Sequence, residues 1–173
     1  MSRLLRVSAR FCFLFLPVTA LPAQTYTAIG EYKFAGTSAK GIAIDSDGRR
    51  LFVAGGDGVT VLNADTGATI GTIGGLKGAQ DVMLIPGMNG EEKAPSTKGF
   101  ASDETGHVIA FSLADMKPTT SVKLETSGPA SLCYDVDAKT VEAVSASGSL
   151  TTIDADSNKV MKAGKIQFDR LAA

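Results

Sequence analysis

The sequence predicts an all-β fold built from repeated four-stranded units. Three segments of the chain align with one another, their apolar residues alternate with polar ones over short runs, and no stretch carries a sustained helical period. The units begin at Gly41, Asp81 and Ser131. Four strands in about 40–45 residues is the period of a β-propeller blade. Because a blade buries its faces against neighbouring blades, we expect the units to pack in series.

Residues 1–23 have the layout of a secretory signal peptide. A basic region, a short apolar core and small residues follow one another: Arg3, Arg6, Arg10, Phe11–Leu16, Val18–Ala20 and Leu21–Ala23. Cleavage is expected after Ala20 or Ala23. The apolar core is far shorter than the roughly 20 residues that a membrane-spanning helix needs. We therefore expect a periplasmic or extracellular protein with no membrane span after cleavage, and a partial propeller over residues 24–173.

The first full unit, over about residues 41–80, gives the clearest pattern. Its expected strands are Gly41–Asp45, Arg50–Ala54, Gly58–Asn63 and Thr69–Ile73. Asp47-Gly48 and Asp65-Thr66-Gly67 supply turns between them, since glycine accepts positive φ. Ahead of this unit, residues 26–34 predict one extra strand, placed to be the outermost strand of a preceding blade.

The second and third units, about residues 81–130 and 131–168, follow the same pattern with departures. In the second, the polar insert Pro86–Lys98 separates the first two strands, and we expect a flexible surface loop that is free to contact a partner. In the third, Cys133 is the one cysteine left after signal cleavage, so no intrachain disulfide is expected. Its apolar neighbours predict a small buried side chain.

Composition excludes some classes of function. The chain has 173 residues, 44% hydrophobic and 20% charged, with 17 basic and 18 acidic residues. Loss of the three leader arginines lowers the formal net charge of −1 by three units. With no basic excess to neutralise phosphates, nucleic acid is not an expected partner. A single histidine leaves little material for a histidine-based metal or acid–base site, and no cofactor is expected.

The repeat resembles a known family at these residues. Ile44–Ala54, followed by Val59–Asn63 and Thr66-Gly67, is similar to the YVTN-type repeat of the YncE-like family of exported bacterial seven-bladed propellers. The resemblance runs from about Tyr26 to Phe168, weakens in the third unit, and corresponds to the first half of such a ring. It implies periplasmic or cell-surface placement and binding of a ligand or partner, with mostly no established reaction.

Three blades fall short of the 4–8 of a closed propeller. Two explanations follow from this count. Either the chain is a truncated or split part of a longer ring, or it associates with another chain, for example as a head-to-tail pair of three-blade halves.

The rim of the channel is where we expect a ligand site, because loops from several blades converge there. In a propeller, the turns between second and third strands share one rim with the crossings between blades. The ligand-binding residues predicted there are Lys40, Asp57, Gln80, Asp81, Asp103, Glu104 and His107. No metal-binding or catalytic motif is found in the sequence, and the ordinary alternative is that these are solvated loop charges.

The sequence therefore favours an exported, non-catalytic propeller module that binds a protein or a small molecule. The alternative is a fragment of a propeller enzyme of lactonase or lyase type, whose metal would sit at the channel mouth. Asp81 and Glu104 could contribute carboxylates to such a site, with further ligands from blades that this chain lacks.

Overall fold

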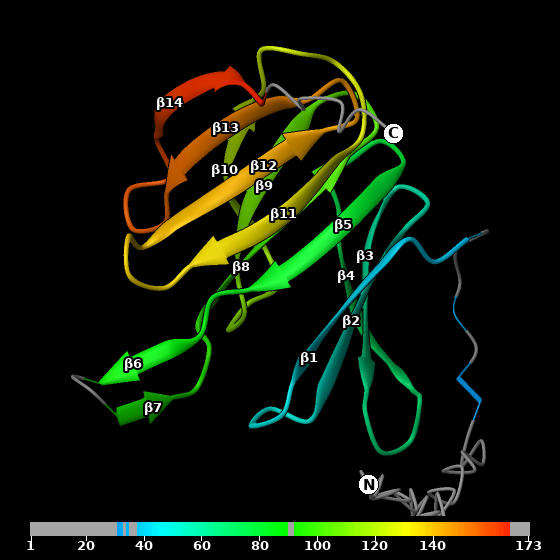
Figure 1. The fold of residues 1–173 in the computed structure, drawn as a ribbon. Coiled ribbons are helices and arrows are strands. Elements are labelled where there is room, and N and C mark those ends of the chain that lie inside the picture. Colours follow the sequence, from blue (N-terminus) through cyan, green and yellow to red (C-terminus); the bar gives the residue numbers. More distant parts are fainter. Residues whose placement is uncertain (1–30, 33, 35–37, 90–91, 167–173) are drawn as a thin grey trace, which may run out of the picture. The chain divides into compact units, whose positions relative to one another are not determined.

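The computed structural model describes residues 31–32, 34, 38–89 and 92–166, and these form three four-stranded antiparallel sheets with no helix (Figure 1). The first sheet has the order β1-β2-β3-β4, with bounds Gly41–Asp45, Arg50–Gly55, Gly58–Asn63 and Thr69–Ile73. These bounds agree with the sequence prediction to within one residue. We call this sheet blade 1.

Blades 2 and 3 repeat the arrangement of blade 1. Blade 2 has the order β5-β8-β9-β10, with bounds Ala79–Leu84, Lys98–Asp103, His107–Ser112 and Pro118–Lys123. Blade 3 has the order β11-β12-β13-β14, with bounds Ala130–Asp135, Thr140–Ser145, Ser149–Asp154 and Val160–Lys165. The predicted all-β fold of blade-like sheets is confirmed. The extra strand predicted over residues 26–34 lies largely outside the described residues, and of that segment Glu31, Tyr32 and Phe34 are described and lie in no strand.

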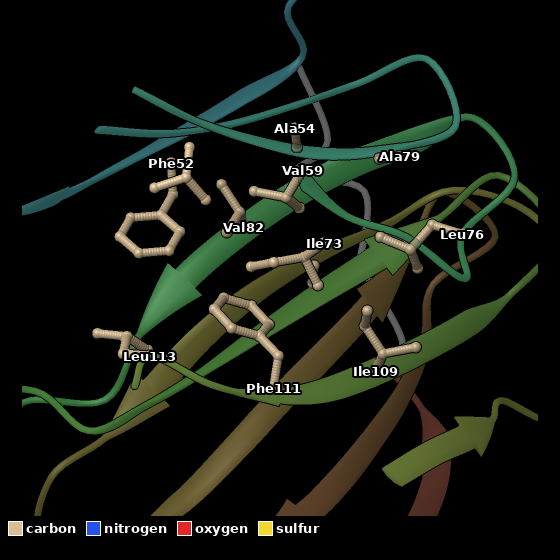
Figure 2. Close-up of a cluster of buried hydrophobic side chains, with 12 residues drawn as sticks. Phe52, Ala54, Val59, Ile73, Leu76, Ala79, Val82, Ile109, Phe111 and Leu113 are labelled. Atoms are coloured by element: carbon tan, nitrogen blue, oxygen red, sulfur yellow. The ribbon is translucent and has the colours of Figure 1, made fainter. Parts of the chain in front are cut away.

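Two apolar clusters join the blades in series. The first lies between blades 1 and 2 and contains Phe52, Val61 and Ile73 on one side with Ile109 and Phe111 on the other (Figure 2). The second lies between blades 2 and 3 and is built in the same way around Phe100, Val108, Val141 and Ile153, among others. Successive residues of blade 2 thus face the two clusters in turn, Phe100 and Val108 toward blade 3 and Ala101 and Ile109 toward blade 1, as the period of 2 along a strand requires.

The insert of blade 2 differs from its prediction. Its residues form a two-stranded hairpin, β6 (Gly87–Asn89) and β7 (Glu92–Ala94), instead of an irregular loop (Figure 1). The backbone N–H of Ile85 donates to the carbonyl of Lys98 at 2.9 Å and closes the base of the hairpin. A Cβ on Gly87 would lie 2.1 Å from the carbonyl oxygen of Pro95, so the close approach of the two hairpin arms requires glycine there.

The prediction for Cys133 is also wrong, because its side chain is exposed. On β11, Leu132 and Tyr134 pack against blade 2, so alternation places Cys133 on the opposite face. Within the described residues no further blade covers that face. In the part of the chain that the structure describes, no helix is long and apolar enough to cross a membrane.

Candidate functional site

The loops predicted to share one rim do lie together, and main-chain hydrogen bonds join them. Ala79 N donates to Gly56 O at 2.8 Å, which ties the crossing between blades 1 and 2 to the β2–β3 turn. Glu104 N donates to Gly78 O at 3.1 Å, and Ala146 N to Pro129 O at 3.3 Å. Turns between second and third strands therefore share one rim with the crossings between blades.

A pocket of about 470 Å³ opens on this rim. Its lining comes from the segment before β1, from β5, and from β11 and β12 with one residue adjoining each: Lys40, Gln80, Asp81, Pro129, Ala130, Ser131, Val144, Ser145 and Ala146. We call it the rim pocket. It brings together three of the seven predicted residues, Lys40, Gln80 and Asp81. Gln80 and Asp81 lie within β5 and not in the crossing itself, because the strand begins already at Ala79.

Asp81 links two blades within this pocket. Its Oδ1 accepts the N–H of Val82 at 2.9 Å, and its Oδ2 accepts the N–H of Leu132, on β11, at 2.8 Å. On the other side, a Cβ on Gly41 would lie 2.8 Å from the Cα of Asp81, so β1 passes too close to β5 for any side chain at that position. Both carboxylate oxygens therefore accept main-chain N–H groups, and the bond of Oδ2 holds the first strands of blades 2 and 3 together.

The remaining polar side chains of the rim pocket come from all three blades. Lys40 has an exposed side chain, and its N–H donates to Ala54 O at 2.9 Å, which fixes its backbone on blade 1. Gln80 Nε2 donates to Gly78 O at 2.9 Å. Ser131 on blade 3 is exposed, while Ser145 is buried and its Oγ accepts the N–H of Ser149 at 3.1 Å.

Asp103 and His107 lie in a second pocket, of about 350 Å³, lined by Gly75, Lys77, Asp103, Thr105, His107 and Ser121. Asp103 is 2% exposed. Its Oδ1 accepts the N–H groups of Thr105 at 2.9 Å and His107 at 2.8 Å, and its Oδ2 accepts the N–H of Lys77 at 3.2 Å. Burial by itself raises the pKa of this carboxyl, but these hydrogen bonds outweigh burial and hold the pKa below its usual range. Asp103 thus fastens the blade crossing to the β8–β9 turn.

The ring of His107 continues this network. Thr105 Oγ1 lies 2.8 Å from Asp103 Oδ1 and 2.9 Å from His107 Nδ1. An ionised carboxylate can only accept, so the single hydroxyl proton of Thr105 goes to Asp103 and Nδ1 must donate to Thr105. In the neutral ring Nε2 is then the unprotonated nitrogen. His107 Nδ1 is also 3.7 Å from Asp103 Oδ2, within reach of an ion pair when the ring is protonated.

The other two predicted residues line neither pocket. Asp57 is exposed in the β2–β3 turn, and Glu104 is exposed with its carboxyl group against Gly78. Among the described residues, no group of three or more His, Cys, Asp or Glu side chains is arranged to hold a metal ion.

Sequence reasoning missed Ser131 and Ser145, which line the rim pocket. The repeat itself held the signal for both. Ser131 begins the third unit as Asp81 begins the second, and Ser145 ends β12 as Asp103 ends β8. Ser145 Oγ accepts the N–H of Ser149, and the Asp103 carboxylate accepts the N–H of His107, in each case four residues later. The two residues therefore stabilise equivalent turns in the same way.

Comparison with known proteins supports the fold but identifies no family. No family model and no curated protein matches the chain. Among the solved structures that it resembles is hydrazine synthase from Kuenenia stuttgartiensis, with a TM-score of 0.62 and 18% sequence identity over 73% of this chain. This likeness shows the fold. The match covers 36% of the hydrazine synthase chain, so the chain spans about a third of that protein's length.

Proposed function

We propose that this chain is an exported, non-catalytic propeller module of the YVTN-repeat type, whose rim pocket binds a small polar ligand with an acidic group. One observation carries the proposal. Lys40, which directly precedes blade 1, lines one pocket of about 470 Å³ together with Gln80 of blade 2 and Ser131 of blade 3. Convergence of side chains from several repeats on one rim is how propellers and similar scaffolds build ligand sites.

The chemistry of the pocket favours an anionic group on the ligand. Lys40 forms no ion pair with the described residues, so its ammonium group can meet a carboxylate or phosphate. The amide of Gln80 and the hydroxyl of Ser131 add neutral hydrogen-bonding groups. Asp81 also lines the pocket, but both of its oxygens already accept main-chain N–H groups.

Small carboxylates test this proposal. We expect succinate and citrate to raise the melting temperature of the chain in a saturable way, with sodium chloride of equal ionic strength as the reference. A ligand at 100 times its Kd adds about 2.7 kcal/mol to stability. Lys40→Ala should abolish the rise, whereas Lys159→Ala, which removes an exposed lysine on blade 3, should leave it unchanged. Equal loss in both variants would show non-specific charge screening and would contradict the proposal.

Export has its own test, because the signal peptide rests on the sequence alone. The full chain, expressed in a Gram-negative host, should appear in the periplasmic fraction with a new N-terminus at Leu21 or Gln24. A charge in the apolar core, Leu14→Arg, should leave the uncleaved chain in the cytoplasm. An uncleaved wild-type protein in the cytoplasm would refute export and leave the binding proposal standing.

A further inference from the structure

The two junctions between blades use the same polar contact. Arg50, the first residue of β2, donates from Nη1 to the carbonyl of Leu113 at 2.7 Å. Lys98, the first residue of β8, donates from Nζ to the carbonyl of Ala155. Leu113 and Ala155 each directly follow the third strand of the next blade. A cation at the start of a second strand thus bonds a fixed carbonyl of the blade that follows.

A phenylalanine accompanies each cation. The guanidinium of Arg50 lies 5.6 Å from the ring centre of Phe52, and the ammonium of Lys98 lies 5.7 Å from that of Phe100. Both rings are fully buried against the following blade. A blade therefore docks its successor with a cation and a phenylalanine two residues apart, which we call the docking pair.

The outward face of blade 1 has the features that receive a docking pair. The carbonyl equivalent to those of Leu113 and Ala155 is that of Ala64, which follows β3. On β1, Ile42 is 62% and Ile44 is 64% exposed, whereas Val82, the counterpart of Ile42 in blade 2, is 3% exposed. Part of the face is covered by residues that precede β1, since the ring of Phe34 lies against Gly55.

Tyr32 occupies the place of the cation on this face. Its hydroxyl donates to the carbonyl of Ala64 at 2.7 Å, and its ring lies against Gly67. The contact is made by one exposed side chain, and it leaves Ile42 and Ile44 open. Among the described residues, a partner that brings a cation to the carbonyl of Ala64 displaces the hydrogen bond of Tyr32 and the packing of its ring on Gly67.

A second copy of this chain does not supply the docking pair at its other end. In blade 3 the equivalent positions are Thr140 and Glu142. The carboxylate of Glu142 accepts the hydroxyls of Thr140 at 3.1 Å and Thr152 at 2.8 Å. Glu142 forms no ion pair with the described residues. Head-to-tail contact would bury its carboxylate against the isoleucines of blade 1 with only these two hydroxyls as partners, and burying a charge without an ion pair is strongly unfavourable.

We propose that the outward face of blade 1 docks a β-blade of a different polypeptide, one whose second strand begins with Arg or Lys and has Phe two residues later. The cation bonds the carbonyl of Ala64 in place of Tyr32. The phenylalanine and its apolar neighbours cover Ile42 and Ile44. The receiving face on blade 1 thus repeats the faces that blades 2 and 3 already use inside the chain.

The chain itself serves as the probe once blade 3 is given the missing pair. The variant Thr140→Lys with Glu142→Phe should associate head to tail, with a mass in light scattering that rises with concentration, while the wild type stays monomeric. Adding Ile44→Asp on the receiving face should restore the monomer. Adding Tyr32→Ala should lower the Kd, because the carbonyl of Ala64 is then open.

Two outcomes would overturn the proposal. One is a folded double variant that stays monomeric. The other is association that Ile44→Asp does not reduce, which would mean that the altered blade 3 associates non-specifically and not with the outward face of blade 1. If Glu142→Phe prevents folding, the variant Thr140→Lys with Glu142→Leu replaces it, since it keeps the cation and adds a smaller apolar group. That variant should also associate, and adding Ile44→Asp should again restore the monomer.

Discussion

Replacing Phe52 by alanine is expected to lower the free energy of unfolding by about 3–5 kcal/mol. The ring of Phe52 is fully buried and stacks on Phe111 with centroids 5.9 Å apart, so it joins blades 1 and 2 (Figure 2). Removal of the ring leaves a cavity between two sheets that are also held by backbone contacts on the rim, and those contacts limit how far the sheets can close over it.

Urea unfolding of Phe52→Ala beside Ile42→Ala checks this expectation. Ile42 is apolar and lies on blade 1 too, but it is exposed, so its truncation should change stability by no more than about 0.5 kcal/mol. Similar losses in both variants would mean that the cluster between blades 1 and 2 does not form as described.

The second large effect is expected at Asp103, where Asp103→Asn should cost about 2–3 kcal/mol at neutral pH. The carboxylate accepts N–H groups from two separate loops, and the amide of asparagine can replace one acceptor oxygen at most. Asp57→Asn makes the same change in the equivalent turn of blade 1, where the side chain is exposed, and should have almost no effect.

The loss at Asp103 should depend on pH in a defined direction. The pKa of Asp103 in the folded chain lies below the ordinary value of 3.8, so folding is favoured by the ionised form. Its contribution is complete at pH values above that ordinary pKa and disappears as pH falls through the lower folded pKa. The difference between wild type and Asp103→Asn, measured by urea unfolding at neutral pH and at about pH 3, should therefore shrink in acid. A difference that stays constant would show that the hydrogen bonds to the ionised carboxylate are not its source.

Most of the blade structure could be predicted from the sequence because it depends on local signals. Blade 1 alternates apolar and polar residues between turns such as Asp47-Gly48, and its four strands fall where these signals place them. The insert does contain a turn signal, Asn89-Gly90, but no alternation of apolar and polar residues flanks it, so its two short strands were not predicted. Cys133 was misassigned because its half-buried neighbours Leu132 and Tyr134 face blade 2 while Cys133 faces away from it.

The sequence could predict on which rim the candidate site lies, but not which of the rim residues share one pocket. The propeller rule places Lys40, Gln80 and Asp81 on one rim, yet residues 80 and 40 meet only through the packing of β1 beside β5. The two hydrogen bonds of Asp81 could not be read from the sequence, because one of them reaches Leu132 in the next blade. The docking pair was missed for the same reason, since Arg50 and its acceptor Leu113 are 63 residues apart.

The amide chemical shifts of the chain during a titration with succinate test directly whether the rim pocket is the functional site. We expect saturable shifts at Lys40, Gln80, Ser131 and Ala146, which line that pocket, and little change at the opposite rim around Lys139 and Asp156. Shifts that gather at the opposite rim instead, or no saturable shift at any residue, would contradict the proposed site.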